Sequence, residues 1–290
     1  MLLAHGDGAA ALDFHAHPDV WLLIAVLVGG YFSLIRYVGP QRVEPGEPVV
    51  TSRQKLSFLA GVVVLWIGAD WPMHELGEDF LFSMHMVQHT LFSLVAPPLI
   101  LMGMPKWMLR LPLQKRAALK VARALTRPVV GLVLFNAVIV VTHWPALVNL
   151  SLRSEIAHFG IHAVLVSASV IMWWPVVDRL PELSRMSPPG KMLYLFLQSI
   201  VPTVPASFLT FSDGVLYDAY AEFPRLWNMG VIADQQVAGL IMKIVGGLLL
   251  WLAIAILFFR WSSAEERQQA KEVSWDDFER ELQAWELRRT

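Results

Sequence analysis

Residues 79–105 read D-F-L-F-S-M-H-M-V-Q-H-T-L-F-S-L-V-A-P-P-L-I-L-M-G-M-P, the most informative apolar run in the chain. The run is long and apolar enough to cross a bilayer, for which about 20 residues are needed. It nevertheless contains two histidines, His85 and His89, well inside the apolar part. Because these histidines are four residues apart, they share one face of a helix. An ionisable side chain within a membrane helix is costly, and it indicates a functional site.

The composition is that of an integral membrane protein. Of the 290 residues, 56% are hydrophobic and 16% are charged, whereas soluble domains carry about 25% charged residues. The formal net charge of −1 gives no indication of a nucleic-acid partner. The chain contains no cysteine, which excludes disulfides and thiolate metal ligands. The N-terminus lacks the features of a cleaved signal peptide, so we expect the first span to act as the insertion signal.

Seven apolar segments predict an all-α bundle of seven transmembrane helices. They lie at residues 18–38, 55–73, 79–104, 128–148, 155–177, 190–211 and 235–259. We expect an extracytoplasmic N-terminal arm over residues 1–17, a seven-helix transmembrane domain over residues 18–261 and a cytoplasmic amphipathic helix over residues 262–290. In this last part, four large apolar residues recur at helical spacing: Trp275, Phe278, Leu282 and Trp285.

The basic residues predict the orientation of the bundle. Of the 23 Lys and Arg residues, 20 fall in the first, third and fifth connections and in the C-terminal tail. Arg153 and Arg225 fall on the opposite side, and Lys243 lies within a span. Because cytoplasmic loops carry the excess of basic residues, we expect the N-terminus outside and the C-terminus in the cytoplasm.

This orientation places the histidines in the outer half of the bundle or outside it. His85 and His89 lie on the third span, and His158 and His162 form a second pair on the fifth span, again four residues apart. His143 lies near the outer end of the fourth span. Two such pairs can present up to four ring nitrogens to one space. The sequence therefore predicts a histidine-lined cavity that opens outward.

The residue types indicate which ion such a cavity would bind. Imidazole and thioether together suit copper, above all Cu(I), whereas imidazole alone also suits zinc or iron. Met84 and Met86 flank the first histidine pair, and Met242 lies two turns into the seventh span. A zinc protease motif is excluded because no glutamate lies between His85 and His89. A second interpretation is that the histidines only form hydrogen bonds between helices.

Three other functions use similar residues. The two histidine pairs could supply the axial ligands of one haem, as in an electron-transfer protein. A di-iron oxygenase also uses histidine pairs, but these histidines face the wrong compartment for that class. A copper permease needs a polar path to the cytoplasm, for which the inner halves of the spans offer little beyond Gln198 and Lys243.

Several motifs occur in the order found in a known family. They are H-M-V-Q-H at 85–89, A-P-P-L at 96–99, G-M-P at 103–105, T-H-W-P at 142–145, H-F-G-I-H at 158–162, W-W-P at 173–175 and the stretch from 234 to 242. Together they resemble the CtaG family of cytochrome c oxidase assembly factors, over residues 56 to 247.

This resemblance implies a non-enzymatic membrane protein in the cytoplasmic membrane of a bacterium, with copper delivery to the oxidase as the usual proposal. The partners it implies are the lipid bilayer and an oxidase subunit or a copper chaperone. The matching positions are His85, His89, His143, His158, His162 and Asp234. We include Asp70, at the outer end of the second span, among the expected ligands. Lys243 departs from the family pattern, and we expect it to repel a bound cation or to pair with Asp70 or Asp234.

Overall fold

The computed structural model describes residues 14–183 and 186–288. Over these residues the chain is helical and contains no strand. Five helices are long and apolar enough to cross a membrane, and the number rises to seven if each of two bent helix pairs forms one span. The predicted all-α class and the presence of several candidate spans are therefore confirmed.

The helical elements are short pieces joined end to end in several spans. The α-helices are α2 (Pro18–Ser33), α3 (Ser52–Ala69), α4 (Met73–Glu75), α5 (Phe82–Thr90), α6 (Ala96–Gly103), α7 (Lys106–Arg110), α8 (Arg116–Leu125), α9 (Pro128–Thr142), α10 (Pro145–Ser151), α11 (Glu155–Val177), α12 (Pro188–Ile200), α13 (Thr203–Phe211), α14 (Asp218–Glu222), α15 (Val231–Leu240) and α16 (Gly246–Leu287). The π-helical turns are η1 (Leu34–Val38), η3 (Leu76–Phe80), η4 (Leu91–Val95) and η6 (Ile241–Val245). The 3-10 turns are η2 (Gly39–Gln41) and η5 (Leu111–Leu113).

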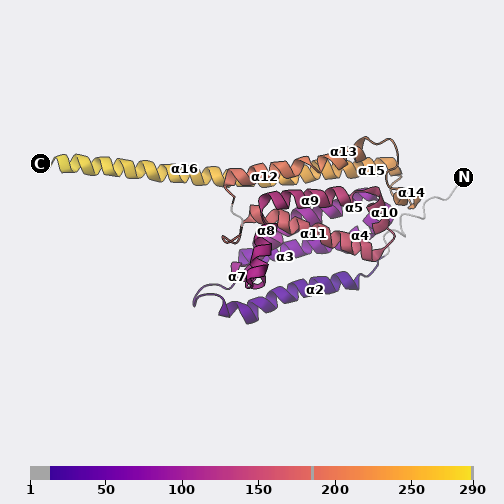
Figure 1. The fold of residues 1–290 in the computed structure, drawn as a ribbon, viewed down its shortest axis with the longest axis horizontal. Helices are drawn as coiled ribbons and strands as arrows, with labels where there is room; N and C mark the ends of the chain where they lie inside the picture. The colour runs from indigo at the N-terminus through magenta and orange to yellow at the C-terminus, as the bar shows by residue number, and fades with distance from the viewer. Residues whose placement is uncertain (1–13, 184–185, 289–290) are drawn as a thin grey trace.

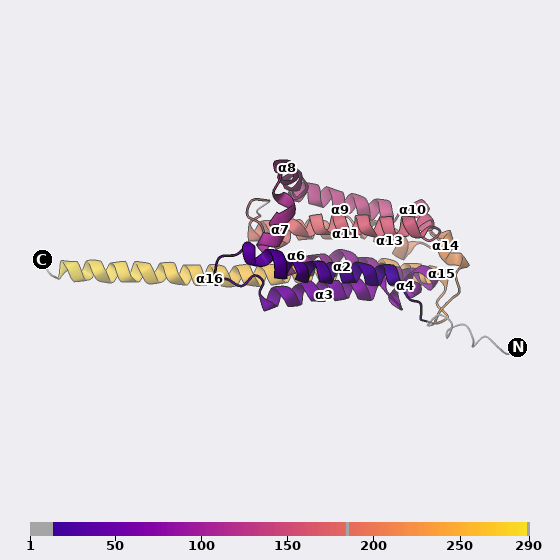
Figure 2. The ribbon, with the colours of Figure 1, turned by 90° about the horizontal axis from the view of Figure 1, so that it is seen from below.

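The long helices form an elongated bundle with two different ends (Figure 1). The short helices α4, α10 and α14 lie at the end where α2 begins, and α7 and α8 lie at the opposite end (Figures 1 and 2). Residues 1–13 of the expected N-terminal arm lie outside the described residues. Within the bundle, α3 packs against α6, α9 against α11, α12 against α16 and α13 against α15. We call the end with α4, α10 and α14 the arm end, and the end with α7 and α8 the α16 end.

The C-terminal part of α16 projects far beyond the bundle (Figures 1 and 2). This helix runs from Gly246 to Leu287 without a break, so the amphipathic helix expected after residue 261 is a continuation of the last span. The four residues of the predicted apolar stripe are 41–66% exposed. A straight helix keeps them clear of the bundle, because at about 1.5 Å per residue the tail extends tens of ångströms.

Proline positions account for breaks in two spans. The sixth predicted span consists of two helices, because α12 ends at Ile200 and α13 begins at Thr203, directly after Pro202. The third span contains the π-helical turn η4, which leads into Pro97 and Pro98 at the start of α6. Proline has no backbone N–H and clashes with the preceding turn, so the regular hydrogen-bond ladder cannot continue through it.

Glycines let α3 and α6 approach each other closely. A Cβ added at Gly103 would lie 2.4 Å from the backbone nitrogen of Phe58, and one added at Gly61 would lie 2.7 Å from Cγ1 of Ile100. Small residues at such contacts allow backbones to meet in membrane proteins. This contact fixes the third span against the second, and thereby the position of α5.

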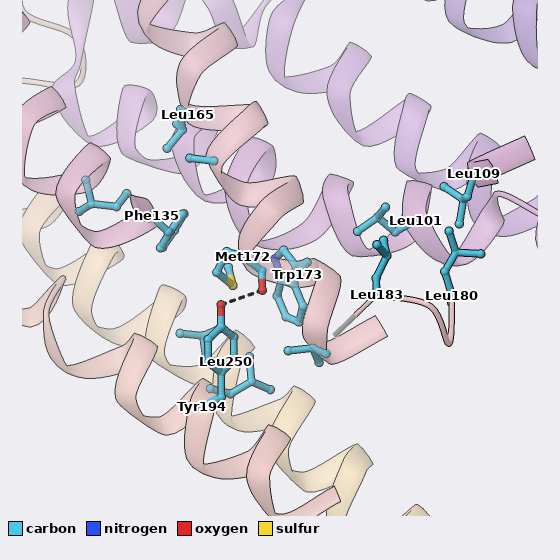
Figure 3. Close-up of a cluster of buried hydrophobic side chains, with 14 residues drawn as sticks. Leu101, Leu109, Phe135, Leu165, Met172, Trp173, Leu180, Leu183, Tyr194 and Leu250 are labelled. Carbon is cyan, nitrogen blue, oxygen red and sulfur yellow. Dashed lines mark hydrogen bonds between the residues drawn. The ribbon is translucent and has the colours of Figure 1, made fainter. Parts of the chain in front are cut away.

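A layer of buried apolar side chains, drawn in Figure 3, extends to Leu109 on α7 and therefore reaches the α16 end. Its members include Leu101, Phe135, Leu165, Met172, Trp173, Tyr194, Leu195 and Leu250. The hydroxyl of Tyr194 donates to the carbonyl of Met172 over 3.0 Å, as the dashed line in Figure 3 marks. Gln198 donates to the Tyr194 hydroxyl over 3.0 Å and accepts from Asn136 over 2.7 Å. The polar groups next to the layer are thus bonded to one another.

Candidate metal centre

Both predicted histidine pairs face the same space near the arm end of the bundle. His85 and His89 lie one turn apart on α5, with ring centroids 4.3 Å apart. His158 and His162 lie one turn apart on α11, with ring centroids 4.2 Å apart. The two pairs meet most closely at His89 and His162, whose ring centroids are 5.0 Å apart. Two separate helices therefore bring four imidazoles together.

The ring nitrogens converge within the reach of one ion. The Nε2 atoms of His89 and His162 are 3.1 Å apart. Ligand atoms of His85, His89 and His162 all lie within 4.8 Å of one another, and so do those of Glu78, His158 and His162. A tetrahedral ion bound at 2.0–2.1 Å holds its nitrogen ligands about 3.3 Å apart. Small side-chain movements would therefore bring either group to coordination distance.

Glu78 joins the two histidine pairs, and our sequence analysis missed it. Its Oε1 atom is 2.8 Å from Nδ1 of His85, and its Oε2 atom is 3.0 Å from Nδ1 of His158. The second contact is an ion-pair contact without the alignment of a hydrogen bond. An ionised carboxylate only accepts, so His85 donates from Nδ1 and keeps the lone pair of Nε2 for a ligand. Histidines that bind metals commonly have such an outer partner.

His143 follows α9 and extends the cluster toward the middle of the bundle. Its ring centroid is 5.7 Å from that of His89. Its Nδ1 atom donates to the carbonyl oxygen of Ile139 over 2.7 Å. This bond leaves the lone pair on Nε2, which has no hydrogen-bond partner among the residues that the structure describes.

Two further histidines connect the cluster to the surface at the arm end. The ring centroid of His74 on α4 is 5.5 Å from that of His158, and that of His17 is 4.8 Å from that of His74. His17 also lies 2.6 Å from the carboxylate of Glu75, measured from Nε2 to Oε1. A row of seven rings results: His17, His74, His158, His162, His85, His89 and His143. We refer to these residues as the histidine row.

The two predicted aspartates lie outside both converging groups of ligand atoms in the described part of the chain. Asp70 accepts from the indole nitrogens of Trp21 and Trp66, over 2.9 and 2.5 Å. Asp234 accepts from the backbone nitrogens of Phe82 and Ser83, over 2.8 and 2.9 Å. These contacts give both aspartates positioning roles at the ends of spans.

The predicted methionines separate into two groups. Met84 packs against an apolar cluster that contains Leu76, Leu81 and Leu226. Met86 and Met242 line a cavity together with His89 and His143. Only the second group is therefore placed to add sulfur ligands near the histidines.

The expected pairing of Lys243 with Asp70 or Asp234 is wrong. Both carboxylates already accept hydrogen bonds from other residues. The Lys243 ammonium instead lies over the ring of Phe211, with Nζ 5.7 Å from the centroid. Such a contact attracts a cation to the face of an aromatic ring.

Three π-helical turns adjoin the histidine row. Turn η3 carries Glu78, η4 begins two residues after His89, and η6 carries Met242 and Lys243. Single π-helical turns are uncommon and often occur at functional sites, because they shift the side chains that follow. These shifts help to decide which side chains meet at the histidine row. A helical wheel drawn from the sequence assumes a regular α-helix and cannot predict them.

Comparison with known proteins agrees with the motifs. The family model for the cytochrome c oxidase caa3 assembly factor, Caa3_CtaG, matches residues 30–264. Uncharacterized protein Mb0105 of Mycobacterium bovis and uncharacterized protein MT0111 of Mycobacterium tuberculosis are each 25% identical over 237 residues, or 75% of this chain. The chain spans only 35% of the length of each of these relatives. No solved structure matches. The family match confirms the resemblance, and the chain belongs to the CtaG family of cytochrome c oxidase caa3 assembly factors.

Proposed function

We propose that this protein binds copper in the histidine row at the outer face of the cytoplasmic membrane and delivers it during oxidase assembly. The observation that carries the proposal is the convergence of ring nitrogens from α5 and α11 within 4.8 Å. The ion would pass to an oxidase subunit or to a copper chaperone. In this proposal the protein is a carrier. It makes or breaks no covalent bond in the oxidase subunit or chaperone that receives the ion.

The donor set suits copper. Imidazole nitrogens bind copper, zinc and iron, and thioether sulfur near His89 and His143 shifts the preference toward Cu(I). Glu78 contributes the negative charge that offsets part of the charge of the ion, and it fixes the rings of His85 and His158. Buried groups of this kind are costly in a membrane protein, which favours a functional role over simple helix pairing.

The proposed membrane topology has seven spans, with the N-terminus outside. It requires that each bent pair, α3 with α4 and η3 or α8 with α9, accounts for one crossing. Support comes from the two ends of the bundle, because the beginning of α2 and the projecting part of α16 lie at opposite ends (Figure 1). An odd number of crossings separates the two termini in this way, and the basic residues favour the α16 end as cytoplasmic.

Single cysteines can test this topology, because the chain has none of its own. Both test positions are exposed: Asp213 lies in the connection between α13 and α14, and Glu265 lies in the C-terminal part of α16. We expect Asp213→Cys to react with a membrane-impermeant maleimide in cells whose cytoplasmic membrane is intact. Glu265→Cys should react only after that membrane is permeabilised. Labelling of both positions in intact cells would contradict the proposed orientation.

The packing favours an ion over a haem as the bound group. The Nε2 atoms of His89 and His162 are 3.1 Å apart, close enough for a direct hydrogen bond. The cavity lined by His89 has a volume of about 50 Å³. Pockets for larger organic ligands are typically about 300–1,000 Å³. An absorption spectrum of the purified protein gives a simple check, because a Soret band would support the haem alternative.

The apolar layer favours a carrier over a copper permease. A permease would need polar groups along a continuous path to the α16 end. Between the histidine row and the α16 end, such a path would meet Phe135, Leu165 and Leu250. These residues belong to the buried apolar layer in Figure 3. Gln198 is fully buried and bonded to Asn136 and Tyr194, so it offers no free ligand on that route.

Removal of the α5 histidines tests the copper proposal. We expect the His85→Ala/His89→Ala variant to bind copper at least about 100-fold more weakly. The reason is that loss of a single partner outside the ligand shell already lowers metal affinity by about 10–100-fold. The measurement is the copper content of purified protein by mass spectrometry, beside oxidase activity in cells that carry the variant. Gln41→Ala is the control, because Gln41 is exposed on η2 and, within the described residues, its side chain donates only to the carbonyl oxygen of Tyr37. Equal copper in the wild type and the double variant would overturn the proposal.

A further inference from the structure

A cavity continues from the histidine row toward the middle of the bundle. It has a volume of about 50 Å³ and lies between α5, α9, the α12–α13 break and η6. A single water needs only about 10–15 Å³. The cavity thus has room for one ion and leaves little space for a larger ligand.

Two buried nitrogens beside the cavity lack hydrogen-bond partners in the described part of the chain. They are Nε2 of His143 and Nδ1 of His89, on side chains that line the cavity. The two residues are only 7% and 6% exposed. The bond from Nδ1 of His143 to Ile139 leaves the lone pair on Nε2. A buried polar atom without a partner is unfavourable, so two of them at one cavity indicate a missing ligand.

The ligand types change along the row. Glu78 provides carboxylate oxygens near His158 and His85, and the closest contact between the two helices joins the imidazoles of His89 and His162. The cavity adds the thioethers of Met86 and Met242. No carboxylate lines it among the described residues, whereas the positively charged Lys243 does. Soft, neutral ligands and a nearby positive charge disfavour a divalent ion and favour a soft monovalent one.

We propose that His143, Met86, Met242 and Nδ1 of His89 form a second metal site, which takes a soft monovalent cation of the Cu(I) type. His89 links this inner site to the outer centre, because its Nε2 atom faces His162 and its Nδ1 atom has no hydrogen-bond partner among the described residues. A neutral imidazole has a single lone pair, so His89 serves one site at a time, and when both sites are filled the inner ion keeps His143 and the two thioethers. An ion moves between the sites by exchanging ligands on neighbouring rings, with no change of oxidation state. The proposal rests on the proposed function, in which the outer centre captures the ion.

Silver provides a probe for this second site, because Ag(I) is a soft monovalent ion that stays in one oxidation state. The purified full-length protein is titrated with Ag(I), and bound silver is counted by mass spectrometry. We expect two ions in the wild type and one in His143→Phe/Met242→Leu. We also expect one ion in His85→Phe/His158→Phe, which removes outer ligands only. Met108→Leu is the control and should keep two ions, because Met108 is buried in a different apolar cluster.

The pattern of losses separates the two proposals. One ion in the wild type that is lost only in the outer variant would overturn the inner site and leave the proposed function intact. One ion that is lost only in the inner variant would overturn the outer centre instead. No bound ion in the wild type would overturn both. Thermal melting of each variant shows whether a loss of binding reflects a loss of folding.

X-ray absorption of the Cu(I)-loaded protein gives a second readout that does not depend on counting ions. We expect metal–sulfur scattering in the wild type and a weaker sulfur signal in Met242→Leu. Exchange of methionine for leucine conserves volume and is well tolerated in cores, so this variant should fold. A sulfur signal that is absent in the wild type, or unchanged in the variant, would overturn the inner site.

Discussion

Glu78→Gln should weaken copper binding by about 10- to 100-fold, the usual cost of losing an outer partner of metal-bound histidines. Glutamine has almost the same shape, so the change removes the charge and replaces one of the two acceptor oxygens with an N–H₂ donor. The carboxylate contacts Nδ1 of both His85 and His158, and it orients rings from two different helices. The affinity is measured by competition with a chromophoric Cu(I) chelator.

Asp79→Asn is a matched control for this prediction. Asp79 is the next residue on η3 and is exposed, so its replacement removes the same charge from the same turn. We expect its copper affinity to stay within about twofold of the wild type, because exposed charges are well screened. Equal losses in both variants would mean that Glu78 acts only through the general charge of the turn. No loss in either would remove Glu78 from the centre.

The spans could be predicted well where local sequence decides them. The fifth span was expected over residues 155–177, and α11 has these bounds. A long apolar run follows Ser154, whose hydroxyl accepts from the backbone nitrogen of Ala157 and caps the helix. The fourth span was expected to run to residue 148, but α9 ends at Thr142 and a separate helix, α10, begins at Pro145. The second was expected to run to residue 73, but α3 ends at Ala69, and the chain then bends by 52° into α4 and η3. Such bends depend on packing against other spans, which the apolar pattern does not encode.

The candidate site shows the same division between local and distant contacts. The spacing of four residues places His85 beside His89 and His158 beside His162, and helix geometry alone predicts this. The contacts of Glu78 depend on η3 folding back onto two spans, so a search within the apolar runs passes over it. A glutamate directly before a span with inward histidines is the signal that could have found it.

The largest expected effect on stability comes from Asp234, on α15. Its two carboxylate oxygens accept from the backbone nitrogens of Phe82 and Ser83, and the residue is only 1% exposed. The first N–H groups of a helix have no partner within the helix. Asp234 therefore caps α5 from a distant part of the chain, and its negative charge is favourable at a helix N-terminus.

Asp234→Leu removes both acceptors and leaves two buried N–H groups without partners, at a cost of about 1–3 kcal/mol each. We expect the melting temperature of the purified protein to fall by roughly 5–10 °C. Asp213→Leu, at an exposed position before α15, should shift it by far less. Asp234→Asn distinguishes capping from coordination, because its amide supplies one acceptor oxygen and places an N–H₂ group against the other backbone donor. A variant that melts like the wild type but loses copper would show Asp234 to be a ligand. A lower melting temperature with copper still bound in the cold would support its role as the cap that holds His85 and His89 in register with α11.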